Sequence, residues 1–209
     1  MDKINEVLKK IDDLVDDIQD LEERDAIEVI NKIKEKIYNI SPLNSEPVDC
    51  VRWIESDKVI ANDYNPNKVA PPEMKLLERS IEQDGYTQPI VAYYDKKQDK
   101  YIIVDGFHRH RVGKESNVIK NRVKGYLPVV VIDKPLKDRI ASTIRHNRAR
   151  GTHEILPMAE IVQKLYFSGM SDKKIMQELG MEKDELLRLK QFTGLGALFA
   201  GREYSKAWE

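Results

Sequence analysis

Side chains that can bind ligands or transfer protons are most concentrated in the stretch Asp105-Gly106-Phe107-His108-Arg109-His110-Arg111, here called the DGFHRHR box. It follows the β-branched run Tyr101 to Val104, and its spacing predicts a strand that ends at a glycine before a helix begins. Gly106 lets the backbone approach a ligand closely, and the first N–H groups of a helix bind anions. Arg109 can donate two hydrogen bonds to one phosphate. The box therefore predicts a phosphate site.

Asp105 would repel a phosphate, so we expect it to act as a metal ligand or as a base near a hydroxyl group. The alternative for the whole box is an ordinary surface turn with solvated charges. The charge distribution favours a ligand. The net charge is only -1, but residues 105–150 carry 12 bases and 4 acids, whereas residues 1–40 carry 12 acids and 7 bases. A basic region of this kind predicts a polyanion or a phosphorylated ligand.

The elements that position the box form a mixed α and β domain, which we expect over residues 48–135. Short strands are predicted at 51–54 and 58–60, and a helix that Gly85 ends is predicted from Pro72. Residues 89–94 and 101–104 predict a hairpin, residues 112–117 continue the helix after Gly106, and residues 127–132 predict a buried strand. The fold class is α+β, with helical segments on both sides of the sheet domain.

The first segment, residues 1–42, has apolar residues three and four positions apart, in two stripes whose register jumps near residue 25. This pattern predicts a helical hairpin or one long helix with a skipped register. The stripes are short for an independent coiled coil. They either pack inside the domain or bind a second copy or a partner, and a homodimer is expected.

Residues 136–209 are expected to be helical, with a helix-turn-helix at about 171–192. Ser171 is a good N-cap, Gly180 a good C-cap, and a second helix follows from Lys183 to Phe192. Two short helices with a glycine turn are typical of DNA-binding proteins, although such a pair can also pack or bind protein. The candidate DNA contacts are Lys173, Lys174, Lys183, Arg188 and Lys190, balanced by acids in the same segment.

Composition excludes several classes. Hydrophobic residues make up 41% of the chain, and no stretch approaches the roughly 20 apolar residues of a spanning helix. The single cysteine, Cys50, excludes an internal disulfide and a cysteine-built zinc site. We expect a cytoplasmic protein with no membrane partner.

Three motifs in order, residues 77–91, the box, and His146-Asn147-Arg148-Ala149-Arg150, make the chain resemble the ParB/sulfiredoxin family. The likeness covers about residues 50–155, and the helix-turn-helix follows where ParB proteins carry theirs. The resemblance implies that Gly106, His108, Arg109 and Arg111 bind nucleotide phosphates. It also implies that Gln88 and Pro89 line the base and ribose side. Sulfiredoxin activity is excluded because Phe107 stands at the position of its catalytic cysteine.

The third motif implies further nucleotide contacts from Asn147 and Arg150, and a possible Mg²⁺ contact from Asn147. It begins with His146 where ParB has a glutamate, and imidazole is a poorer partner for Mg²⁺. The expected cofactor is a nucleoside triphosphate, CTP or ATP, with or without Mg²⁺. The overall layout resembles the IbrB-like branch, prophage or plasmid co-activators that are often paired with a protein resembling phosphoadenosine-phosphosulfate reductase.

These observations predict a nucleotide-responsive DNA-binding or regulatory protein. The alternative is an NTPase or a small-molecule kinase on the same fold, in which Asp105 or Glu82 would be the base and the arginines would stabilise the transferring phosphoryl group. A nuclease ranks last, because the sequence has no dense carboxylate cluster suited to two metals.

Overall fold

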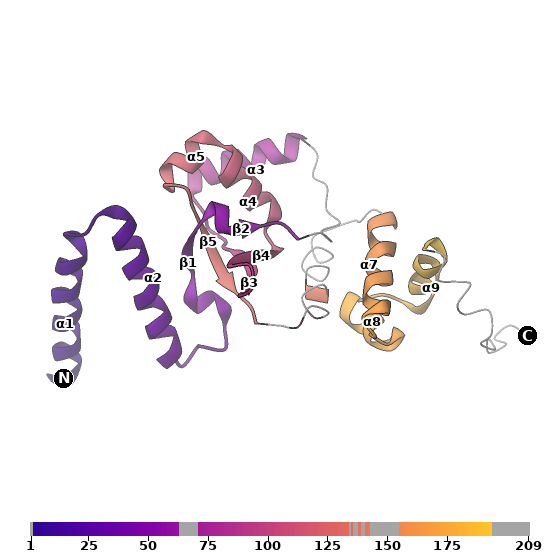
Figure 1. Cartoon of the computed structure of the whole chain (residues 1–209), viewed down its shortest axis with the longest axis horizontal. Coiled ribbons are helices and arrows are strands. Elements are labelled where there is room, and N and C mark those ends of the chain that lie inside the picture. The colour runs from indigo at the N-terminus through magenta and orange to yellow at the C-terminus, as the bar shows by residue number, and fades with distance from the viewer. Residues whose placement is uncertain are drawn as a thin grey trace, which may run out of the picture.

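The computed structural model describes residues 2–62, 71–133, 135, 138, 141–142 and 155–193. The described chain forms an N-terminal pair of helices, a sheet domain with three helices, and a C-terminal group of three helices (Figure 1). The expected α+β class is confirmed. The expected domain boundaries stay predictions. In the described residues, no helix is long and apolar enough to cross a membrane.

The sheet has five strands in the order β1-β5-β3-β4-β2. β1 (Arg52–Glu55) pairs antiparallel with β5 (Tyr126–Val131), and β5 pairs parallel with β3 (Ile90–Asp95). β3 and β4 (Lys100–Asp105) form the predicted antiparallel hairpin, and the two-residue β2 (Val59–Ile60) adds to β4 in parallel. β2 pairs only with Tyr101 and Ile102, so the C-terminal end of β4, which leads into the box, extends past β2 and keeps β3 as its paired strand.

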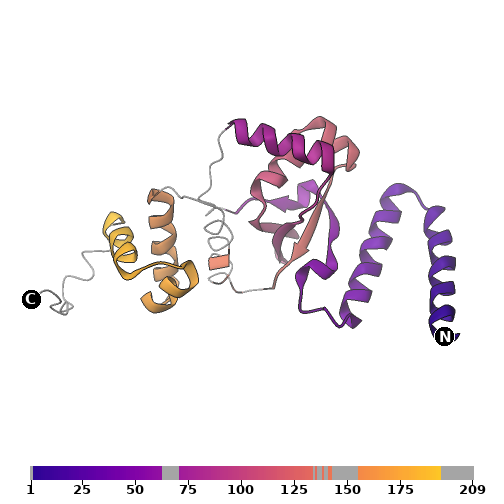
Figure 2. The ribbon, with the colours of Figure 1, turned by 180° about the vertical axis from the view of Figure 1, so that it is seen from behind.

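Three helices contact one another beside the sheet: α3 (Pro71–Asp84), α4 (Phe107–Glu115) and α5 (Asn117–Arg122) (Figure 2). The predicted helix over 112–117 is corrected, since Ser116 is extended and separates α4 from α5. Ile81, Val112 and Ile119 form the helix core, and the buried residues of the sheet core are mostly β-branched. Gly113 permits this packing, because a Cβ there would lie 2.1 Å from the Tyr86 hydroxyl oxygen and 2.5 Å from Leu127 Cδ2.

The N-terminal segment is a hairpin of α1 (Asp2–Gln19) and α2 (Glu23–Ile40), so the alternative of one long helix is wrong. α2 packs along β1 and along η1 (Pro47–Cys50), a short 3-10 helix. The side-chain amide of Asn31 accepts a hydrogen bond from the Trp53 N–H at 2.9 Å and donates one to the Trp53 carbonyl at 2.7 Å. Ion pairs of Arg24 with Glu55 and of Glu35 with Arg52 hold the helix against the strand.

The C-terminal helices are α7 (Ile155–Phe167), α8 (Asp172–Leu179) and α9 (Lys183–Phe192), with a core of their own. The Ser171 hydroxyl accepts a hydrogen bond from the Lys174 N–H, and Gly180 is left-handed with φ of 60°. These are the N-cap and C-cap that the sequence predicts. Pro157 falls in the first turn of α7, where its missing N–H costs nothing.

Candidate phosphate site and helix-turn-helix

The box is a strand-turn-helix at the end of β4. Gly106 has φ of 90° and ψ of 24°, a left-handed conformation that glycine adopts without strain, and it forms the N-cap of α4. Its carbonyl accepts the first helical hydrogen bond from the His110 N–H at 2.9 Å. Within the described chain, no side chain caps this helix, and its first turn contains no acidic residue. The first N–H groups of α4 thus provide positive potential for an anion.

Arg109 lies across the turn. Its Nη2 is 3.3 Å from Asp105 Oδ2, and its Nη1 donates to the Pro89 carbonyl at 2.9 Å and to Gln88 Oε1 at 3.3 Å. The side chains of Arg109 and Asp105 are only 12% and 5% exposed. A Cβ at Gly106 would lie 3.0 Å from Arg109 Nη2. The guanidinium therefore joins the glycine turn to the segment before β3 and balances the buried carboxylate.

His108 and Arg111 are the other predicted phosphate contacts. His108 is half-buried, and burial, followed by the nearby Arg111 charge, lowers its pKa, although the Asp105 carboxylate acts in the opposite direction. The Arg111 side chain is half exposed, and its Nε lies 3.0 Å from both carboxylate oxygens of Glu115. Arg111 borders a hollow of 310 Å³ between α3 and α4, with Lys75 and Glu78 on the opposite wall.

Two residues that stabilise the box were missing from the predicted set. His110 is buried, and its Nε2 lies 3.0 Å from the Val59 carbonyl oxygen, which connects α4 to β2. Its Nδ1 has no hydrogen-bond partner among the residues that the structure describes, and burial lowers the pKa of the ring. Tyr86 donates its hydroxyl to the Arg109 carbonyl at 3.0 Å, and burial raises its pKa to about 12. Both roles depend on tertiary packing, and the only signals in the sequence were positions, that of His110 in the box and that of Tyr86 in the motif of residues 77–91.

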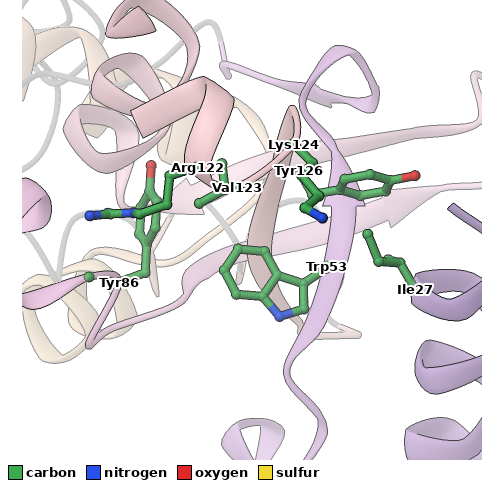
Figure 3. Close-up of a pocket in the computed structure, with 8 residues that line it drawn as sticks. Ile27, Trp53, Tyr86, Arg122, Val123, Lys124 and Tyr126 are labelled. Carbon is green, nitrogen blue, oxygen red and sulfur yellow. The ribbon is translucent and has the colours of Figure 1, made fainter. Parts of the chain in front are cut away.

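Tyr86 also belongs to a second hollow of 420 Å³ between α2, β1 and the start of β5 (Figure 3). The rings of Trp53 and Tyr86 meet edge to face there, with centroids 6.4 Å apart. Arg122 lies beside Tyr86 in Figure 3, and it donates to the Ile81 and Glu82 carbonyls at the end of α3. Tyr86 therefore connects the box to this hollow, where it packs against Trp53 and where Ile27 of α2 forms part of the wall.

The remaining predicted residues are distributed differently. Glu82 lies on α3, and no hydrogen bond or ion pair between Glu82 and Asp105 is found in the described part of the chain. Asn147 and Arg150 lie outside the described residues. Among the described residues, no group of three or more His, Cys, Asp or Glu side chains could hold a metal ion. The structure therefore brings Gln88, Pro89, Asp105, Gly106 and Arg109 together and leaves Glu82 apart from them.

The cationic residues of the helix-turn-helix divide into two groups. Lys173 and Lys174 at the start of α8, and Lys183 and Arg188 on α9, are exposed. Lys190 is only 2% exposed, its Nζ lies 2.5 Å from Asp172 Oδ1, and it stands 4.6 Å above the Tyr166 ring. Lys190 therefore stabilises the contact between the three helices, and its charge does not lie on the outer surface.

Comparison of the sequence with known protein families gives matches over both the sheet domain that carries the box and the helix-turn-helix. Residues 42–147 match the ParB N-terminal domain, and the chain belongs to this family. Residues 153–201 match the IbrB-like C-terminal HTH domain, which places the chain in the IbrB-like branch. The resemblance stated from the sequence is confirmed on both counts.

A curated relative, the uncharacterized protein YbdM of Escherichia coli (strain K12), is 55% identical over 196 residues, or 94% of this chain and 93% of YbdM. Two similar solved structures are of C-terminally truncated chromosome-partitioning protein ParB from Caulobacter crescentus. The complex with CTP-gamma-S is 19% identical, with a TM-score of 0.40, and covers 72% of this chain and 88% of that one. The complex with the centromeric parS site is 16% identical, with a TM-score of 0.47, and covers 71% and 76%.

Proposed function

We propose that this protein is a nucleotide-responsive DNA-binding regulator that binds the phosphates of a nucleoside triphosphate at the DGFHRHR box. The observation that carries the proposal is the uncapped N-terminus of α4, which follows a left-handed glycine and has no acid in its first turn. Such a helix end attracts phosphate through its N–H groups and its dipole. Membership of the ParB family supports the same ligand class.

The side chains take different roles in this proposal. Backbone N–H groups of α4 bind the phosphate, and His108 and Arg111 lie where they can contact it from the same helix. Arg109 acts as a positioning residue, because its guanidinium holds Gln88, Pro89 and Asp105 around the turn. Gln88 and Pro89 border the base and ribose side. CTP and ATP remain the candidate nucleotides, and Mg²⁺, with Asn147 as its candidate ligand, remains part of the proposal, as does Arg150.

The kinase or NTPase alternative has less support. A catalytic base must reach the proton that it removes, whereas Asp105 is buried beside Arg109 and Glu82 is not joined to the box. Turnover of nucleotide in the absence of DNA would favour the enzymatic alternative over a regulatory switch.

Isothermal titration with CTP, ATP, GTP and ADP, each with and without Mg²⁺, tests the nucleotide site. Arg111→Ala removes one charge from the box, and Lys120→Ala removes one from the exposed surface of α5 as the matched control. We expect one nucleotide to bind, Arg111→Ala to weaken it about tenfold or more, as for a lost charge-assisted hydrogen bond, and Lys120→Ala to leave it unchanged. Absence of binding by all four nucleotides at millimolar concentration would contradict the proposal.

DNA binding is proposed for the exposed cations Lys173, Lys174, Lys183 and Arg188, with Lys190 in a structural role. Fluorescence anisotropy with duplex DNA at several salt concentrations measures how many phosphates are neutralised. We expect Lys183→Ala to reduce the salt slope by about one, as for the loss of one phosphate contact. A switch also requires that nucleotide changes the affinity for DNA, because a ligand that binds two states equally shifts neither. Equal DNA affinity with and without nucleotide would contradict the proposal that nucleotide regulates DNA binding.

The resemblance to the IbrB-like branch further supports a partner protein similar to phosphoadenosine-phosphosulfate reductase and a prophage or plasmid co-activator role, and the apolar stripes of residues 1–42 support a homodimer. Co-purification of the full chain with a candidate reductase-like protein encoded beside it tests the first. An unchanged elution of both proteins after mixing would argue against it.

A further inference from the structure

The N-terminal hairpin has a large apolar surface that the described part of the chain leaves exposed. Seven apolar residues of α1 lie on one face, and the six that are more than a third exposed range from 39% for Leu14 to 68% for Ile4. No residue of α1 or α2 is buried. The α1 face consists of Ile4, Val7, Leu8, Ile11, Leu14, Val15 and Ile18.

α2 has two faces with different surroundings. Asn31 and Lys34 face the sheet, where they bind the backbone of β1 and of the residue before it. Ile30 and Ile37 remain 38% and 57% exposed. This two-helix hairpin leaves the stripes of both helices unburied, whereas two hairpins together can form a four-helix bundle with a closed core. The exposed stripes have the kind of surface that such a bundle would cover.

The spacing of the α1 face points to a second copy of this chain as the occupant. Its seven positions are symmetric about Ile11, so that reversing the helix superimposes position 4 on 18, 7 on 15 and 8 on 14. A two-fold axis at Ile11 would place the same apolar side chains opposite one another in antiparallel helices. A two-fold interface requires this self-complementarity.

The charges of α1 agree with the antiparallel orientation. Residues 2–10 carry all three lysines of the helix and two acids, a net charge of +1, whereas residues 11–19 carry four aspartates and no base, a net charge of -4. An antiparallel pair sets the lysine half of one copy beside the aspartate half of the other. A parallel pair would bring the two aspartate halves together, which is unfavourable because like charges repel.

We infer that the protein forms a homodimer through its N-terminal hairpin, with two α1 helices packed antiparallel about Ile11 and the α2 helices completing a four-helix bundle. The interface lies on the face of α2 away from β1. The dimer depends on neither nucleotide nor DNA, so its test is separate from that of the proposed function.

Sedimentation equilibrium of the full chain measures the dimer and its dissociation constant. Ile11→Ala removes apolar surface and raises helix propensity, so unfolding of α1 does not account for a loss of dimer. We expect it to weaken dimerisation about tenfold or more, as for truncation of a buried isoleucine in each copy. Lys9→Gln, on the opposite side of α1, leaves the dissociation constant within about twofold, because an exposed ion contributes little. A monomeric wild type, or an unweakened Ile11→Ala dimer, would overturn the inference.

Disulfide trapping tests the orientation in a Cys50→Ala background, which removes the native thiol. In the antiparallel bundle, a mixture of Ile4→Cys and Ile18→Cys chains cross-links, and so does Ile11→Cys alone. Ile4→Cys alone does not, because its two copies lie about 20 Å apart at 1.5 Å per residue. Equal cross-linking of Ile4→Cys alone and of the mixture would reject the antiparallel arrangement.

Discussion

Asn31 on α2 binds both backbone groups of Trp53 on β1, and it does so as a neighbouring strand would. Trp53 stands opposite Pro128, in the register of β1 with β5, and β1 is an edge strand. Pro128 has no N–H to donate to a neighbouring strand. This costs no hydrogen bond to β3, because β3 pairs with β5 only from Val129 onward. This amide thus adds two backbone hydrogen bonds to the ion pairs of Arg24 and Glu35 that connect the N-terminal hairpin to the sheet.

Replacing Asn31 with alanine tests this connection. Asn31→Ala removes two part-buried hydrogen bonds, so we expect it to lower the free energy of unfolding by about 1–3 kcal/mol in urea denaturation. Asn39→Ala, at an exposed position of the same helix, should change it by less than about 0.5 kcal/mol. Equal stability of the two variants would show that the amide contributes nothing.

Gly113 is a position where the space, rather than the backbone angle, requires glycine. Gly113→Ala places a methyl group against the Tyr86 hydroxyl and Leu127, and we expect it to destabilise the fold by about 1–3 kcal/mol. Tyr86→Phe removes the atom nearest to the new methyl group. The double variant should therefore lose less stability than the sum of the two single losses, a coupling that thermal or urea denaturation can measure. Strict additivity would contradict the contact.

The two lysines of α9 allow a matched charge reversal. Lys190→Glu puts a carboxylate at a buried position beside the half-exposed Asp172 and should destabilise the helical group by about 3 kcal/mol or more. Lys183→Glu makes the same change at an exposed site, and its stability should stay within about 0.5 kcal/mol of the wild type. Thermal unfolding followed by circular dichroism distinguishes the two. Similar transitions in both variants would place Lys190 on the surface.

His110 predicts a loss of stability in acid. Burial lowers its pKa in the folded protein below the ordinary 6.5, an effect that Lys114 increases and that the Val59 carbonyl and Glu115 oppose. As the pH falls below about 6.5, the unfolded chain binds the proton more readily, so the free energy of unfolding decreases. The urea midpoint should fall between pH 7 and pH 5, and less steeply in His110→Gln. A wild-type midpoint that is constant over this range would exclude the effect, as would equal slopes in both proteins.

Local signals account for most of what the sequence predicts correctly. Alternating β-branched residues indicate the β3-β4 hairpin, and Ser171 and Gly180 mark the ends of α8, because strands and helix caps depend on neighbouring residues. The burial of the Arg109 side chain could not be predicted from neighbouring residues, because its partners Gln88 and Pro89 come from another part of the chain. The spacing of α9 did indicate that Lys190 is buried, although its positive charge led to its prediction as a surface DNA contact. It lies four positions after Leu186, on the buried face of α9.

The two edges of the sheet bear on how the protein behaves at high concentration. Exposed strand edges are templates on which other chains assemble into aggregates. Here one edge carries α2, which occupies the outward groups of Trp53, and the other edge is β2, only two residues long. Among the described residues, the part of β4 that β2 leaves unpaired at its C-terminal end is also short, from Ile103 to Asp105, so both edges are poor templates for a foreign strand. Removal of the N-terminal hairpin would uncover β1, and truncated forms that begin after α2 should precipitate where the full chain stays in solution.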